Sequence, residues 1–143
     1  IKLANNYAKE LGISQDRYNF YTHNLNSSLP ETDLSFDLAI DMTTTHLLNE
    51  VQFENLFSEV YRVLKKNGRF LIFTIISNIL DGKETEDVEM SSGAAVRYYI
   101  HDYEKIANKY RFKIELRDFY TSKTHIGNNT FDRKYLKLVL VKI

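Results

Sequence analysis

The sequence predicts an α/β domain whose mostly parallel sheet ends in an antiparallel hairpin. Segments with helical spacing of apolar residues alternate with short apolar segments through most of the chain. Residues 70–76 form a continuous β-branched and aromatic run, which is typical of a central strand covered by helices on both faces. Residues 112–120 and 135–142 alternate strongly and are joined by a loop rich in Asn and Thr. Such an order of elements is that of an α/β sheet with a terminal hairpin.

The first half of the chain supplies two helices and two strands. Residues 1–12 carry apolar side chains at spacings of three and four, and Gly12 follows as a C-cap. Residues 17–22 alternate as a strand does, residues 24–35 have loop composition, and residues 36–41 form a short apolar strand. Asn49 is a candidate cap for a helix that we expect to run to Lys66 and to stop at Gly68.

The second half adds a long connection and the elements that close the sheet. Residues 77–96 are polar and acidic and contain two glycines, so they predict a long connecting segment of the kind that often carries function. Residues 102–110 predict a short helix. We therefore expect one sheet with strands at residues 17–22, 36–41, 69–76, 112–120 and 135–142.

Composition narrows the class of protein. The chain has 143 residues, 43% of them hydrophobic, which suits one compact core or part of one. The 19 basic and 19 acidic side chains cancel, so no global field favours nucleic acid or an anionic membrane, and a small-molecule partner is expected. There is no cysteine, no apolar run long enough to span a bilayer and no signal-peptide pattern, so we expect a cytoplasmic protein.

Residues 29–73 carry a series of motifs in a fixed order. The loop LPETDLSFD precedes a strand, a His-Leu pair follows that strand, and the next helix ends in RVLKKNG before another strand. This series resembles the middle of class I S-adenosylmethionine-dependent methyltransferases that act on small molecules. The matching residues are Leu29, Pro30, Asp33, Ser35, Phe36, Asp37, His46, Leu47, Arg62, Val63, Leu64, Lys65 and Gly68.

The resemblance implies a Rossmann-like methyltransferase sheet, S-adenosylmethionine as cofactor and methyl transfer to a small-molecule acceptor. Residues 1–143 would be the carboxyl-terminal part of a single methyltransferase-like domain. The family's first strand-helix-strand unit, with its glycine-rich turn and ribose-binding carboxylate, has no counterpart here. The five glycines are scattered, and none follows a strand in a phosphate-binding pattern. We expect an upstream segment or a homo-oligomer to complete the sheet.

Two other interpretations stay open from the sequence. The absent glycine-rich turn also suits a non-catalytic, methyltransferase-like module with a structural or partner-binding role. A fragment of another Rossmann-like protein, such as a nicotinamide dehydrogenase, is disfavoured by the RVLKKNG helix end and by the terminal hairpin.

The resemblance also suggests site residues. It places Asn24 and Leu25 beside the adenine ring, although Asn24 is equally well explained as a turn residue. Asp41, Met42, Thr43 and His46 leave the strand that faces the methyl donor and acceptor. Asp41 could contact the cofactor or hold loop amides, and Met42 and Thr43 could line the substrate pocket. His46 could deprotonate an acceptor or only shape the pocket.

Aromatic residues near position 100 are further candidates for the substrate pocket. Tyr98 and Tyr99 lie where the family's substrate-covering segment enters its last helix, whereas Tyr103 falls on the apolar stripe of that helix and is expected in the core. His23, His101 and His125 show no carboxylate pattern at metal-binding spacing, so no metal site is predicted.

Overall fold

The computed structural model describes residues 1–77, 85–89, 95–99, 101–126 and 129–143. Its main sheet has four strands in the order β1-β2-β6-β5, and β1 pairs in parallel with β2 while the other pairs are antiparallel. The predicted α/β class, the interior position of residues 70–76 and the terminal hairpin are confirmed, in a sheet that is mixed. The expected cover of residues 70–76 by helices on both faces is wrong for the described helices, because α2 and α3 lie on one face and Leu71 and Phe73 on the other face are only partly buried. The strands are β1 (Phe36–Met42), β2 (Leu64–Ser77), β5 (Phe112–Ile126) and β6 (Asn129–Lys142).

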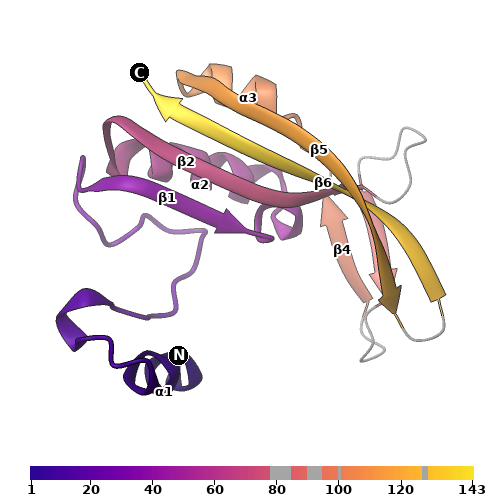
Figure 1. Cartoon of the computed structure of the whole chain (residues 1–143). Coiled ribbons are helices and arrows are strands. Elements are labelled where there is room, and N and C mark those ends of the chain that lie inside the picture. The colour runs from indigo at the N-terminus through magenta and orange to yellow at the C-terminus, as the bar shows by residue number, and fades with distance from the viewer. Residues whose placement is uncertain (78–84, 90–94, 100, 127–128) are drawn as a thin grey trace.

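Helices α2 and α3 cover one face of this sheet, and α1 lies apart from it (Figure 1). A two-stranded hairpin falls in the segment predicted as a connection, of which residues 78–84 and 90–94 lie outside the described residues. These elements are α1 (Lys2–Glu10), η1 (Gln15–Arg17), η2 (Thr45–Leu47), α2 (Glu50–Val63), β3 (Thr85–Glu89), β4 (Ala95–Tyr99) and α3 (Tyr103–Lys109).

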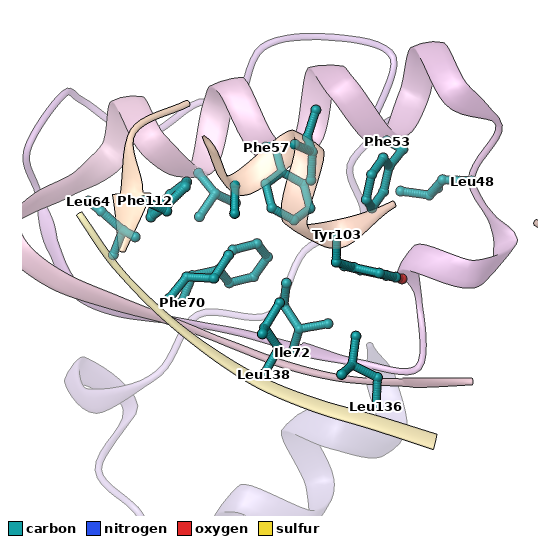
Figure 2. Packing of buried hydrophobic residues seen from close by; sticks show 14 residues of the cluster. Leu48, Phe53, Phe57, Leu64, Phe70, Ile72, Tyr103, Phe112, Leu136 and Leu138 are labelled. Atoms are coloured by element: carbon teal, nitrogen blue, oxygen red, sulfur yellow. The ribbon is translucent and has the colours of Figure 1, made fainter. Parts of the chain in front are cut away.

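The core lies between the two covering helices and the sheet (Figure 2). Phe57 of α2 is fully buried and contacts Phe70 and Phe112 edge-to-face, with ring centroids 5.4 and 6.3 Å apart. Edge-to-face contacts of this kind add to the free energy gained by burying the rings. Period-two alternation sends Phe70 and Ile72 of β2 toward the helices. The other buried strand residues of the cluster are Leu64, Phe112, Leu136, Leu138 and Leu140.

Both helices of the covering layer begin where the sequence predicts. The Asn49 side chain accepts from the Gln52 N–H at 3.0 Å while Gln52 binds back to the Asn49 N–H, which is a capping box. The Asp102 side chain accepts from the Lys105 N–H at 2.9 Å and caps α3.

The expected end of α2 is wrong. The helix ends at Val63 rather than Lys66, and Asn67, not Gly68, takes a positive φ of 64°. Carbonyls of the last turn are taken up by distant groups: Lys142 Nζ donates to Tyr61 at 2.6 Å and to Leu64 at 2.8 Å. The Lys142 side chain thus satisfies carbonyls at the end of α2, and the helix ends five residues before Gly68, the expected stop. Gly68 still matters, because a Cβ there would lie 2.8 Å from the Lys65 carbonyl oxygen.

The strand predicted at residues 17–22 is also wrong. Arg17 closes the turn η1, and residues 18–24 have no regular secondary structure. Alternation makes a strand only where a neighbouring backbone can pair with it, and none of the described strands does.

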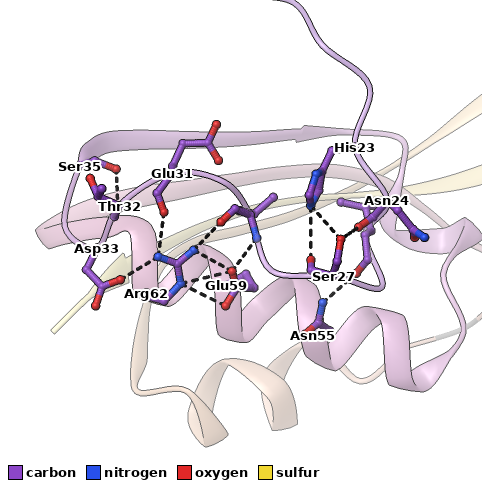
Figure 3. Close-up of polar contacts among 12 residues, drawn as sticks. His23, Asn24, Ser27, Glu31, Thr32, Asp33, Ser35, Asn55, Glu59 and Arg62 are labelled. Carbon is purple, nitrogen blue, oxygen red and sulfur yellow. Dashed lines mark hydrogen bonds and ion pairs between the residues drawn. The ribbon is translucent and has the colours of Figure 1, made fainter.

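Arg62 fastens the segment before β1 to α2 (Figure 3). Its guanidinium donates to the Leu29 and Glu31 carbonyls at 3.0 and 2.9 Å, to Asp33 at 2.7 Å and to Glu59 at 2.8 Å. Glu59 in turn accepts from the Leu29 N–H at 2.7 Å, and the hydrogen bonds from Arg62 lower the pKa of the Glu59 carboxyl. The family-like residues of this segment therefore fix the path of the chain into β1.

On the face opposite α2 and α3, the side chains of β1 are exposed, and β1 is also an edge strand of the described sheet. Leu38, Ile40 and Met42 expose 46, 58 and 63% of their surface, although they alternate as regularly as the buried strand residues. Within the described residues, β1 has β2 on one side and no strand on the other. An unpaired strand edge of this kind can bind a further strand.

Candidate functional site

The candidate site lies where the chain leaves β1. In α/β sheets the carboxyl ends of parallel strands are the usual place for ligands, and β1 and β2 are the parallel pair. Met42 ends β1 with an exposed side chain, and Thr43 follows with a positive φ of 63°. A β-branched residue rarely adopts that conformation, so the turn is held by its surroundings. The Thr43 N–H donates to the Phe73 carbonyl at 2.7 Å and keeps the turn against β2.

Asp41 holds this turn from beneath. Its side chain is 6% exposed and accepts from the Thr44 N–H at 3.0 Å, the Thr45 N–H at 3.3 Å and the Thr45 hydroxyl at 2.7 Å. Three donors compensate a buried carboxylate for the water it has lost. Of the two roles expected for Asp41, this geometry shows the one in which it binds loop amides.

Three further polar side chains meet the same point from other elements. The Thr74 hydroxyl of β2 lies 3.1 Å from the Thr45 hydroxyl and 3.2 Å from Nδ1 of His46. The Tyr103 hydroxyl of α3 donates to Thr45 at 2.9 Å. Together with Asp41, these residues form a buried polar network, in which every side chain is at most 6% exposed.

His46 is held as a neutral imidazole. Its side chain is 3% exposed, and loss of water lowers its pKa from 6.5 to about 4, against the opposing attraction of Asp41. Neighbouring Arg133 and His101 lower the pKa further. A group with so low a pKa binds a proton weakly near neutral pH, but it remains a good partner in a hydrogen bond.

The segment around position 100 lies against the same turn. Strand β4 contacts η2, and His101 places Nε2 2.8 Å from the Leu48 carbonyl while its ring stacks on Phe53 at 3.8 Å. Burial lowers the pKa of His101. Tyr99 is half-buried and stacks at 6.3 Å on His101. The side chain of Tyr98 lies outside the described residues.

The expected adenine side is a turn at some distance along the chain (Figure 3). The exposed Asn24 side chain accepts from the Asn26 N–H at 3.0 Å, and the Asn24 carbonyl accepts from the Ser27 hydroxyl at 2.7 Å. Leu25 packs against the core, and its carbonyl accepts from Asn55 of α2 at 2.8 Å. Asn24 thus does the work of a turn residue, and one lone pair of its amide oxygen stays available.

The structure therefore groups four predicted residues, Asp41, Met42, Thr43 and His46, and brings Tyr99 toward them. It also shows three that sequence reasoning did not assign to the site: Thr45, Thr74 and Tyr103. Thr74 has the clearest signal, since it is the only hydroxyl in the run of residues 70–76. Tyr103 is buried in the core as predicted, and its hydroxyl adds the polar role.

Among the described residues, no group of three or more His, Cys, Asp or Glu side chains is placed to hold a metal ion. No helix in the described part of the chain has the length and apolar character needed to cross a membrane.

Comparison with known proteins now gives the class. Residues 1–131 match the family described as methyltransferase domain, so the chain belongs to this family of enzymes. Its fold is the Rossmann-like fold of methyltransferases, as the sequence predicted. No curated protein sequence is similar enough to count as a relative.

Several solved structures share the fold. An S-adenosylmethionine-dependent methyltransferase from Methanosarcina mazei matches with 20% identity and a TM-score of 0.70, over all of this chain and 77% of that protein. A protein from Pyrococcus horikoshii OT3 matches with 22% identity and a TM-score of 0.66, over all of this chain and 66% of the other.

A third match is the 1,6-didemethyltoxoflavin-N1-methyltransferase of Burkholderia thailandensis, solved with 1,6-didemethyltoxoflavin and S-adenosylhomocysteine bound. Identity is 15% and the TM-score 0.61, over 95% of this chain and 56% of that protein. The chain thus spans 56 to 77% of the length of these three proteins.

Proposed function

We propose that this chain forms the acceptor-facing part of an S-adenosylmethionine-dependent methyltransferase that acts on a small molecule. The observation that carries the proposal is the buried polar network around Asp41 and Thr45, built at the carboxyl end of β1 in a methyltransferase-domain fold. The Burkholderia protein, which was solved with 1,6-didemethyltoxoflavin bound, supports the substrate class.

In this proposal the network orients the turn rather than reacting. Asp41 binds the amides of Thr44 and Thr45 and so presents Met42 and Thr43 outward, where they would contact the methyl donor or the acceptor. Tyr99 would form another side of the acceptor pocket. Methyl transfer needs the donor and the nucleophile in line, and a rigid turn supplies such placement.

His46 is the candidate base, and its environment favours a second role. A neutral, buried imidazole with a pKa of about 4 is better suited to accepting a hydrogen bond than to taking a proton from the acceptor. We therefore expect His46→Gln, which keeps a hydrogen-bonding side chain, to retain more activity than His46→Leu. Equal and complete loss in both variants, with both folded, would instead make His46 the base.

The described residues fit only part of the cofactor. Asn24 and Leu25 could receive adenine and Met42 the methyl end, but no described strand leads into a glycine-rich turn that would hold the methionine and ribose portions. Gly12 follows α1, and Gly68 lies within β2. S-adenosylmethionine, when bound, supplies the electrophilic methyl group, and a strand-turn-helix unit joined to this chain would supply its remaining contacts.

Equilibrium binding of labelled S-adenosylmethionine tests this division of the site. The 143-residue chain is compared with the same chain extended at Ile1 by a glycine-rich strand-turn-helix. We expect micromolar affinity only in the extended protein. Micromolar binding by the short chain would show that the cofactor is held elsewhere, and absence of binding by both folded proteins would contradict the proposal.

Asn24 can be tested in the extended protein. Asn24→Ala should weaken cofactor binding by about 1 kcal/mol, the usual worth of one hydrogen bond. Asn26→Ala, in the same turn but with only its backbone N–H engaged, is the control. Equal affinities of Asn24→Ala and the parent protein, measured by calorimetry, would leave Asn24 as a turn residue.

A second candidate function is a non-catalytic module that binds a partner. The observation in its favour is that β1, among the described strands, pairs only with β2 and exposes Leu38, Ile40 and Met42 on the uncovered face. An edge of this kind pairs readily with another strand, either from a segment joined to Ile1 or from a second copy in a homo-oligomer. Methyl transfer by the extended protein would exclude this candidate as the main function, and a stable complex without cofactor binding would favour it.

A further inference from the structure

The hydrogens of the buried network can be assigned by counting donors. Each threonine or tyrosine hydroxyl has one hydrogen to donate, and a carboxylate has none. Thr45 Oγ1 lies 2.7 Å from Asp41 Oδ2, the shortest contact in the network. Two oxygens this close need a hydrogen between them, so the single hydrogen of Thr45 is spent on Asp41.

The remaining contacts then have one consistent direction. Thr45 can only accept in its contacts with Thr74 at 3.1 Å and with Tyr103 at 2.9 Å, and its two lone pairs are enough for both. The hydrogen of Thr74 is therefore used toward Thr45. The 3.2 Å contact between Thr74 and Nδ1 of His46 can form only if Nδ1 carries a hydrogen.

We infer that Thr74 is a positioning residue that fixes His46 in the Nδ1-protonated tautomer, through a chain of hydrogen bonds that runs from His46 through Thr74 and Thr45 to Asp41. The neutral ring then has its lone pair on Nε2. The relay sets the orientation and the tautomer of a histidine at the ligand-binding end of the sheet, as a carboxylate does when it is bonded directly to an imidazole. The tautomer itself does not depend on the proposed methyl transfer.

Burial makes this arrangement specific. Thr45 and Thr74 are fully buried, and Asp41, His46 and Tyr103 are nearly so, which leaves water little access to replace a missing partner. Reversing one hydrogen bond would leave a hydroxyl oxygen facing the Asp41 carboxylate without a hydrogen between them. The direction of the relay is thus set at its Asp41 end.

The test is long-range ¹H–¹⁵N NMR of the uniformly labelled chain near neutral pH, in which protonated and bare imidazole nitrogens have well-separated shifts. His46→Gln identifies the His46 signals among those of the four histidines. The parent chain should show Nδ1 protonated and Nε2 bare. A predominant Nε2-protonated ring or an imidazolium would overturn the inference.

Three variants test the relay. Thr45→Val removes the acceptor for the Thr74 hydrogen, which then turns to Nδ1, and the His46 proton should move mostly to Nε2. Thr74→Val should also release the tautomer, and Thr74→Ser should restore it. A His46 tautomer that stays Nδ1-protonated in folded Thr45→Val would contradict the relay, even where Thr74→Val fails to fold.

Tyr103→Phe is the control within the same network. It removes a buried hydroxyl that donates to Thr45 and leaves the groups of the Asp41–Thr45, Thr45–Thr74 and Thr74–His46 contacts in place. The His46 tautomer should remain that of the parent chain. A shift as large as that of Thr45→Val would mean that the tautomer responds to general packing, and this would overturn the assignment. Because the readout needs no cofactor, its outcome is separate from that of the methyltransferase proposal.

Discussion

The two faces of the sheet carry the same alternating apolar pattern and differ in what covers them. On the α2 and α3 side, Phe70 and Ile72 are 2 and 1% exposed, whereas Ile40 and Met42 on the other side are 58 and 63% exposed. Strands β1 and β2 are direct neighbours, so strand propensity cannot explain the difference. An apolar pattern predicts which side of a strand can be buried, and a second layer decides whether it is.

The polar residues follow the same division. The network of Asp41, Thr45, Thr74, His46 and Tyr103 lies on the covered side of the sheet, under α3 and η2. Buried polar groups persist only when they are satisfied, and this network satisfies them with one another. The covered side therefore carries the packed core and the polar network of the candidate site, whereas Met42 of that site lies on the open side.

The largest expected difference between the faces comes from a matched pair of isoleucines. Ile72→Ala should lower the free energy of unfolding by about 2–5 kcal/mol, because it leaves a cavity in a packed core. Ile40→Ala, on the paired strand but the open face, should cost less than about 1 kcal/mol, since mostly strand propensity is lost. Urea unfolding of both variants measures this, and similar losses would show that the open face is covered in solution.

Acid should weaken the covered side. The pKa of His46 falls from 6.5 to about 4 on folding, so the unfolded chain binds the proton more tightly. His46 then favours the folded state fully above about pH 6.5, and this contribution of about 3 kcal/mol is lost as the pH falls toward 4. Unfolding free energies across this range should slope less in His46→Gln. Identical slopes would mean that His46 is protonated in the folded chain at the same pH as in the unfolded chain.

Lys142 tests a single buried cation on the covered side. Lys142→Met keeps the stem but leaves the Tyr61 and Leu64 carbonyls without their donor, at a cost of about 1–3 kcal/mol. Burial lowers the pKa of Lys142, so part of that cost is offset by removing a poorly hydrated charge. Lys137→Met on the exposed side of the same strand should change stability little and serves as the control. Thermal unfolding compares the two.

The smallest change in stability is expected where association should change most. Ile40→Lys places a charge on the open β1 edge, and it should alter the free energy of unfolding by only about 0.5 kcal/mol. If the edge pairs with a second copy, sedimentation of the parent chain will show a dimer that Ile40→Lys dissociates. A monomeric parent at high concentration would contradict the homo-oligomer.

Sequence reasoning succeeded where local pattern and tertiary structure agree. The apolar run of residues 70–76, the alternation of the last two strands, the Asn49 cap and the helical spacing of residues 102–110 are all local features of the sequence. It failed at residues 17–22, where alternation had no neighbouring strand among the described residues to pair with. It also misplaced the end of α2, because the capping group is Lys142, 78 residues beyond Leu64.

The candidate site was predicted only in part for the same reason. Asp41, Met42, Thr43 and His46 are close in sequence and follow a recognisable strand. Thr74 and Tyr103 join them from 28 residues beyond His46 and 58 beyond Thr45, and no spacing rule connects such positions. A hydroxyl in an apolar run is the one sequence signal that could have suggested a buried polar partner.

The clamp formed by Arg62 has a consequence for the alignment of β1 against β2. These strands pair with an irregularity between Phe36 and Leu38, a place where a strand could slip by one residue. A slip of one residue would turn Asp41 to the open face and Ile40 to the covered one. Arg62 binds the chain at Leu29, Glu31 and Asp33, just before β1 begins. These contacts restrict the register in which β1 can pair with β2. Arg62 of α2, near the start of β1, thereby favours the register in which the Asp41 carboxylate, and not the Ile40 side chain, lies against Thr44 and Thr45.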